Sequence, residues 1–363
     1  MRSRVSILFL MVTLLATTGL MATGARMQSM GNPHGFVRDY TDIFTFPATI
    51  YQYEGRVVGD LVNPDNQFWT IGALVPYENN LIGIHLNRPT GVNFFAIPDM
   101  DISRKIEFNA GLMDIYGVRF AMAIDSEDNG IERGAHFYEL GGGMSTDMLD
   151  LGLRLYFAGA SEDNGTEITE SVFGMGLAGR YFLQDDDDFT IMALGGLGFE
   201  SASGEEKTDN GSIDASGFDL VLQLGAGINY NLDENNMFIL GIKPFRLATV
   251  SEDWDGDEES ESWIYIPEYH IGLESRITDW LTGRLGARQS YAFYSEKDDP
   301  DAAPSEEASE YISEFQMNLG LAFNFGQFTI DTVLQNDFLF NGPDFIGGNG
   351  NGIASRISVT YTF

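Results

Sequence analysis

The sequence predicts an all-β fold: a transmembrane, antiparallel, up-and-down β-barrel of about 16 strands. Three observations predict it. Apolar and polar residues alternate from about residue 51 to the C-terminal Phe363, the alternating segments are long, and short connections between them take turns with longer ones. A period of two places successive side chains on opposite faces of a strand, which suits a wall between two different environments.

The chain begins with the features of a secretory signal peptide. Arg2 and Arg4 precede an apolar run at residues 5–15, and small residues follow at 22–25. A positive start, a short apolar core and a small-residue cleavage site are typical of such signals. The core is shorter than the about 20 residues of a membrane helix. We therefore expect residues 1–25 to be removed on export, with an uncleaved anchor as the alternative.

Single strands show the alternation clearly. Leu220, Leu222 and Leu224 share one face, whereas Asp219 and Gln223 lie on the other. The longest alternating runs are 215–231, 236–250, 261–276, 279–294 and 309–325. They exceed the about 5–6 residues of a typical soluble strand and suffice for the about 9–11 that cross a bilayer at a tilt.

The strand count follows from these runs. Thirteen segments alternate from Lys105 onward, and three precede it at 51–61, 68–76 and 81–87. The total of 16 is even, so both ends of a barrel domain at 50–363 lie on the same, periplasmic side. A barrel of 14 strands is the alternative if the first two segments pair elsewhere.

Connections of two kinds are expected between the strands. The short ones lie near 114, 146–147, 184–187, 233–236, 278–279 and 326, and the long ones near 125–135, 159–168, 201–214, 251–261, 295–308 and 339–352. Counted with their nearest strand ends, over 125–132, 162–170, 200–214, 252–261 and 296–310, the first five long connections hold half of the 54 acidic residues. We expect short periplasmic turns and long, acidic, solvated extracellular loops. Such loops either serve solubility or concentrate cations, divalent ones included, at a pore mouth.

Composition excludes several kinds of function. The net charge of −34 disfavours nucleic acid as a partner, because no basic stripe is present to displace counterions. The absence of cysteine excludes disulfides, thiolate catalysis and cysteine-based metal sites.

The last strand carries the most specific resemblance. Ile357, Val359, Tyr361 and Phe363 alternate with polar residues up to a terminal aromatic. This pattern resembles the C-terminal signal that the barrel assembly machinery of Gram-negative bacteria recognises. The resemblance implies a porin-like barrel in the bacterial outer membrane, surrounded by lipid and lipopolysaccharide, with its C-terminus in the periplasm.

A second resemblance lies before the first strand. Residues 27–31 and 41–48 look like the corresponding segment of the FadL-like transporter group, which carries an Asn-Pro-Ala tripeptide there. Here Phe46 precedes Pro47 and Ala48, so the match is partial. The resemblance implies that residues 26–49 enter the barrel as a plug or hatch. A periplasmic tail is the alternative.

Charged and polar side chains on the polar phase of their strands are candidates to face the lumen. They are Glu54, Arg56, Lys105, Glu107, Arg119, Arg154, Glu268, His270, Glu274 and Arg356. Their mixed signs either create a transverse field across a pore or pair with one another to hold the wall. The phases of Arg180, Arg284 and Arg288 cannot be assigned, since a bulge would invert them.

Neither catalysis nor a cofactor is predicted. His85 and His270 lack a companion Ser or Asp at a recognisable spacing, so we expect no enzyme. Asp253, Asp255 and Asp257 are a weak calcium candidate, because Ca²⁺ prefers carboxylate oxygens. No EF-hand spacing surrounds them, and a solvated loop is the simpler interpretation.

The leading hypothesis is a channel for passive diffusion of small solutes, biased toward cations. The first alternative is uptake of hydrophobic molecules, which the FadL-like resemblance and Phe36, Phe44, Phe46, Phe94 and Phe95 suggest. The second alternative is a non-transporting structural or surface-adhesion barrel. The sequence leaves open the substrate, the pore width and whether the protein is a monomer or a trimer.

Overall fold

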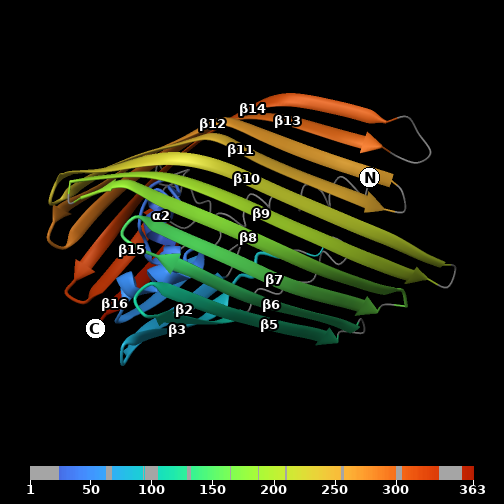
Figure 1. Ribbon diagram of the computed structural model, residues 1–363, viewed down its shortest axis with the longest axis horizontal. Coiled ribbons are helices and arrows are strands. Elements are labelled where there is room, and N and C mark those ends of the chain that lie inside the picture. The colour runs from blue at the N-terminus through green and yellow to red at the C-terminus, as the bar shows by residue number, and fades with distance from the viewer. Residues whose placement is uncertain are drawn as a thin grey trace, which may run out of the picture.

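The computed structural model describes residues 24–62, 68–92, 94, 105–128, 132–163, 165–186, 188–208, 211–254, 257–299, 305–334 and 354–363. Within them, sixteen strands form one closed antiparallel barrel in which β1 pairs with β16 (Figure 1). The predicted 16-strand barrel is confirmed, and the 14-strand alternative is wrong. Most of the predicted signal peptide, residues 1–23, lies outside the described residues.

The strands follow the chain in order around the barrel. They are β1 (Arg56–Val62), β2 (Phe68–Tyr77), β3 (Asn80–Arg88), β4 (Lys105–Leu112), β5 (Tyr116–Asp128), β6 (Glu132–Ser145), β7 (Leu149–Asp163), β8 (Glu167–Asp185), β9 (Phe189–Thr208), β10 (Gly211–Asp233), β11 (Asn236–Trp254), β12 (Asp257–Thr278), β13 (Leu281–Asp299), β14 (Glu306–Phe325), β15 (Phe328–Leu334) and β16 (Ala354–Thr362). In the part of the chain that is described, no helix is long and apolar enough to cross a membrane.

The barrel wall is much taller on one side than on the other. Strands β8 to β14 contain 19 to 23 residues each. Strands β1 to β4, β15 and β16 contain only 7 to 10. At about 3.3 Å per residue, the tall side projects far past the short side, and Figure 1 shows the long strands reaching beyond the others at the end opposite the tight turns.

The predicted long loops at 201–214 and 251–261 are largely strand. β9 ends at Thr208 and β10 resumes at Gly211, while β11 ends at Trp254 and β12 begins at Asp257. The tips of these hairpins carry acidic and hydroxyl residues on both faces, so their backbone pairing continues without the apolar face that reveals a strand in sequence. Much of the acidity assigned to loops therefore stands on projecting strands. The predicted connection at 339–352 lies outside the described residues.

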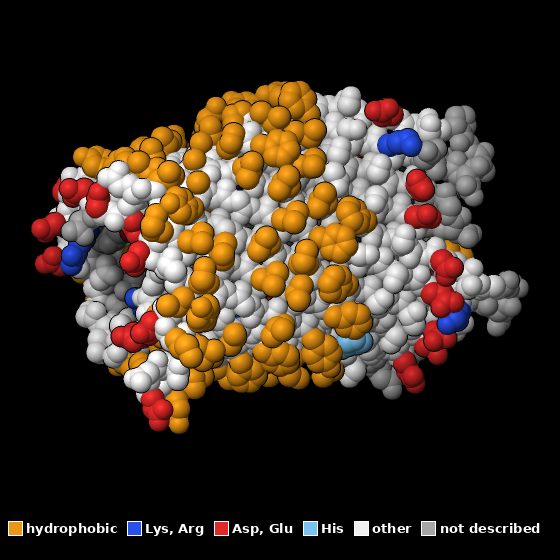
Figure 2. Space-filling view, in the orientation of Figure 1, with side chains coloured by type: hydrophobic (Ala, Val, Ile, Leu, Met, Phe, Trp, Pro, Cys, Tyr) orange, Lys and Arg blue, Asp and Glu red, His pale blue; other side chains and the backbone are white. Residues whose placement is uncertain are grey.

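A hydrophobic band surrounds the outer surface. Figure 2 shows apolar side chains across the middle of the barrel and acidic side chains at both ends. Exposed aromatics mark its two edges, such as Phe173 and Tyr181 on β8, and Phe218 and Tyr230 on β10. These pairs lie 8 and 12 residues apart, so the band is roughly 20–28 Å tall for strands tilted by about 45°.

An N-terminal segment, residues 24–53, lies inside the barrel. It contains α2 (Gly24–Ser29) and the 3₁₀-helices η1 (Tyr40–Phe44) and η2 (Pro47–Tyr53). Pro47 starts η2 at a position where its missing N–H costs nothing. The predicted strand at 51–61 is thus corrected at its start: Ile50 and Tyr53 turn inward against Leu74 and the neighbouring wall, and β1 begins only at Arg56.

Glycines on the inner wall make room for this segment. A Cβ at Gly152 would lie 1.8 Å from the Thr45 carbonyl oxygen, and one at Gly286 would lie 1.9 Å from the Met30 carbonyl carbon. Glycine occurs in strands where another backbone approaches closely. Glycines of the inner wall therefore allow the backbone of the N-terminal segment to pack closely against the strands.

Candidate functional site

Ion pairs tie the N-terminal segment to the barrel wall. Arg180 of β8 is fully buried and lies 2.8 Å from Asp42 of the segment and 2.7 Å from Asp150 of β7. Its guanidinium also donates to the carbonyls of Gly35 and Val37. One side chain of the wall thus binds three points of the segment.

A second anchor lies on β12 and β13. Arg26 of α2 contacts Asp39 at 2.7 Å and Glu274 at 2.9 Å. Arg284 then joins Glu274 and Asp331, each at 2.5 Å. The charges alternate along this chain, so each buried group has a partner of opposite sign.

A third cluster occupies the wall beside η1. Lys105, Glu107, Arg119 and Glu139 are all buried and paired with one another. Arg119 also donates to the carbonyl of Phe44. The mixed charges on these strands thus pair with one another along the wall, and Arg119 links the cluster to the N-terminal segment.

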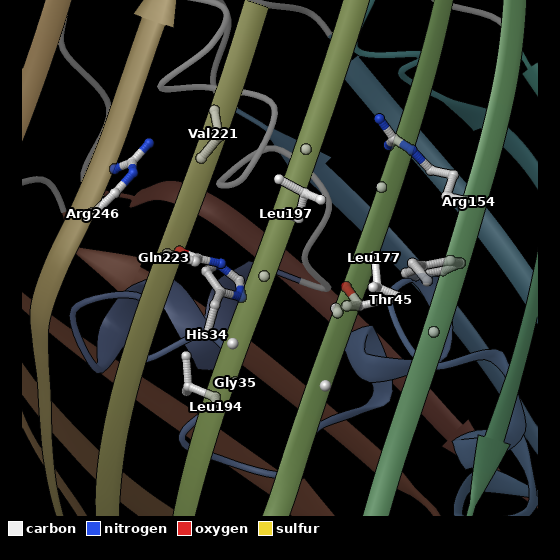
Figure 3. A pocket seen from close by; sticks show the side chains of 18 of the residues that line it. His34, Gly35, Thr45, Arg154, Leu177, Leu194, Leu197, Val221, Gln223 and Arg246 are labelled. Atoms are coloured by element: carbon white, nitrogen blue, oxygen red, sulfur yellow. The ribbon is translucent and has the colours of Figure 1, made fainter.

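Beyond the N-terminal segment lies a cavity of about 420 Å³, bounded by that segment and by the inner faces of β7 to β14. Apolar side chains form part of its wall, among them Val221 and Leu194, which packs against the Phe36 cluster and is labelled with Val221 in Figure 3. Val92 and Phe94, from the connection after β3, pack against the inner faces of β5 to β8 and fill part of the barrel interior there.

Charged side chains also line the cavity. Arg154 lies over the Tyr156 ring at 4.6 Å, and the Tyr156 hydroxyl donates to Glu200. On the far side Lys243 contacts Glu268 at 2.8 Å. The cavity is therefore neither a purely apolar pocket nor a wide aqueous pore.

The structure places the ten candidate lumen residues as follows. Lys105, Glu107 and Arg119 are buried on the inner wall beside η1, and Arg154, Glu268 and His270 line the cavity. Glu274 contacts Arg26, Arg356 contacts Asp60, Arg56 lies over the Tyr53 ring, and Glu54 is exposed before β1. Glu54 thus lies on no strand, because η2 replaces the predicted start of β1.

A bulge conceals the inward position of Arg246 from the sequence alternation. β11 and β12 pair Lys243 with Glu268, then Arg246 with Tyr265, so two residues of each strand are skipped. Pro244 and Pro267 lie in the skipped positions, where a residue without an N–H is tolerated. The bulge inverts the alternation, and Arg246 faces inward although it is an odd number of residues from Lys243. The two prolines are the only sequence signal of this inversion.

The weak calcium candidate gains no support. Asp255 and the side chain of Asp257 lie outside the described residues. Asp253 lines a pocket with Glu258 and Glu259 at the tip of the tall wall. Among the residues described, no group of three or more His, Asp or Glu side chains could hold a metal ion.

At the other end, β16 carries the predicted assembly signal. Val359 and Phe363 are exposed on the outer face, and the Tyr361 ring lies 4.6 Å from that of Phe328. The Phe363 N–H donates to the carbonyl of Gly55, next to β1. The C-terminus thus takes part in closing the barrel.

No protein-family model and no curated protein matches this chain. Among solved structures, the chain is similar over 95% of its length to the CymD monoaromatic hydrocarbon channel (98% of that chain, 12% identity, TM-score 0.43). It is also similar over 95% of its length to a Pseudomonas aeruginosa FadL homologue (100% of that chain, 10% identity, TM-score 0.42). Over 85% of its length it is similar to the ferric yersiniabactin uptake receptor FyuA from Yersinia pestis (80% of that chain, 10% identity, TM-score 0.30). At identities of 10–12%, the ligands in the names of those proteins are not carried over to this chain.

Proposed function

We propose that this protein is a channel of the bacterial outer membrane through which small solutes diffuse passively, and that the N-terminal segment acts as its gate. The observation that carries the proposal is the cavity of about 420 Å³ inside a closed barrel, bounded on one side by that segment. A solute bound there lies inside the barrel, and a rearrangement of residues 24–53 would let it pass.

The outer surface supports a membrane location. An apolar band of roughly 25 Å with aromatic side chains at both edges is the pattern of barrels in the outer membrane. An uninterrupted band of this size would be an aggregation hazard in water. The export signal expected at residues 1–25 and the aromatic C-terminal strand agree with this location.

Uptake of hydrophobic molecules is the second candidate. It is favoured by the apolar part of the cavity, where Leu194 packs against the buried Phe36 cluster of the N-terminal segment. The charged side chains on the same wall favour small polar solutes instead. The diffusion channel predicts steady ion currents, whereas the uptake of hydrophobic molecules predicts a barrel without such currents.

Planar-bilayer recordings of the purified mature protein test the proposal. Steady unitary currents are expected for a channel. A silent barrel that binds a hydrocarbon probe such as toluene would support the second candidate, and a silent barrel that binds neither solute class would support a structural role.

A disulfide tests the gate. A Cβ at Gly272 would lie 3.6 Å from the Met30 Cβ, within the range of a disulfide, and the chain has no native cysteine. In the double variant Met30→Cys with Gly272→Cys, forming the disulfide is expected to lower the conductance, and cleaving it with a thiol reductant is expected to restore the conductance. The single variants serve as controls. Equal conductance before and after verified cross-linking would show that the segment does not gate.

A further inference from the structure

Two buried charges of opposite sign line the cavity without a partner of their own. Asp219 on β10 is 8% exposed and has no hydrogen bond or ion pair to any described residue. The charged groups acting on it are Glu200 and Glu252, which carry the same sign. Asp219 lies directly opposite Glu200 in the sheet, a pairing of like charges that weakens a sheet unless a cation relieves it.

Arg246 on β11 is the positive counterpart. It is 4% exposed, and its Nε and Nη2 atoms are buried without a hydrogen-bond acceptor in the described structure. Its guanidinium lies 5.1 Å from the Tyr265 ring, and the neighbouring cations Lys243 and Arg288 act on the same region. Lys243 is neutralised by Glu268, so Arg246 remains the donor that lacks an anion.

The two groups are held apart by an apolar wall. Arg246 is opposite Gln223, which lies four residues from Asp219 along β10, a separation of about 13 Å between backbones. Val221 lies between them and faces the cavity, and in Figure 3 the guanidinium of Arg246 extends toward its level. The intervening surface suits the apolar body of one ligand rather than two unrelated ions.

We infer that the cavity binds a short zwitterion, with its ammonium group at Asp219 and its carboxylate at Arg246. Three extended residues span about 10 Å, so a tripeptide reaches between the two groups. Charge-assisted hydrogen bonds at both ends would satisfy groups that the protein leaves unpaired. This inference rests on the proposed function and specifies its solute as a zwitterion such as a short peptide.

The test compares trialanine with two analogues that each lack one charge. N-acetyl-trialanine has no ammonium, and trialanine amide has no carboxylate. Calorimetry on the detergent-solubilised mature protein is expected to show binding of trialanine about tenfold or more tighter than that of either analogue. Equal affinities for the three peptides, or no binding of any, would overturn the inference.

Two variants assign the ends. Asp219→Asn should abolish the preference for trialanine over its N-acetyl analogue and keep the preference over the amide. Arg246→Gln should do the converse. Asp214→Asn, an exposed acid on the same strand, and Arg276→Gln, an exposed base on β12, are matched controls that should change neither preference. Preferences that survive in Asp219→Asn or Arg246→Gln contradict the assignment.

Conductance of the same preparations separates this inference from the proposed function. Unitary currents without a preference for trialanine would overturn the zwitterion site and leave the channel in place. Selective binding of trialanine by a barrel that never conducts would retain the site and count against the channel.

Discussion

Two regions of the same lumen treat buried charge in opposite ways. Around the N-terminal segment, Arg180 contacts two carboxylates and Arg284 contacts two more. In the cavity, Asp219 and Arg246 are as deeply buried but have no such partner within the described structure. A buried charge is costly unless it is compensated. Paired charges therefore fix the segment in place, and unpaired ones are left for what enters the cavity.

Breaking a paired charge should have the largest effect. Arg180→Met leaves Asp42 and Asp150 buried without a cation, which costs about 3–5 kcal/mol for such a pair. We expect a lower unfolding temperature in detergent and faster proteolysis of residues 24–53. The control is Arg133→Met on β6, which removes a partly exposed partner of Glu162 on β7. Equal destabilisation by both variants would contradict the anchoring role.

Protonation of His34 should have the next largest effect. Burial lowers the pKa of His34 to about 4, with Lys243 adding to the shift and Asp39 opposing it. The unfolded chain binds this proton near pH 6.5, so stability is expected to fall as pH drops from about 6.5 to 4 and to change no further below that. The loss is about 3 kcal/mol at most. Thermal unfolding across this range measures it, and His34→Gln should flatten that part of the profile. An unchanged slope would exclude His34 as the cause.

Crowding the contact between wall and segment should have a smaller effect. Gly152→Ala places a Cβ on the Thr45 carbonyl, whereas a Cβ at Gly142 would meet nothing within 4 Å. We expect Gly152→Ala to cost about 1–3 kcal/mol and to loosen the segment, and Gly142→Ala to be neutral or slightly stabilising. Chemical denaturation compares the two. Similar midpoints would mean that the segment does not press on the wall at this position.

Neutralising the acidic tip should have the smallest effect. The change of Asp253, Asp255, Asp257, Glu258 and Glu259 to their amides removes five negative charges, and the described side chains among them, Asp253, Glu258 and Glu259, lie at the projecting end of the tall wall. The preference for cations should decrease, and more so at low salt, because exposed charges are screened over about 10 Å at 0.1 M. Reversal potentials in a salt gradient measure the preference. Identical potentials in the variant would reject a role of this tip in selectivity.

The candidate site was only partly predictable, and the misses have physical causes. Arg119 and Glu274 follow the strand alternation, so their inward position could be anticipated. Arg246 could not, because the bulge at Pro244 and Pro267 inverts the phase between β11 and β12. Asp219 lay on the polar phase, but its lack of a partner depends on neighbouring strands that no single segment reveals.

By itself the sequence determined the barrel and its 16 strands, because a wall between lipid and a polar interior requires alternation with a period of two and leaves that period in each strand. Only the tertiary structure decided where the charges meet. Residues 24–53 reach wall positions more than a hundred residues away in sequence, as from Asp42 to Arg180. Whether a buried charge is paired there or left open is a property of packing across the lumen, which local periodicity does not encode.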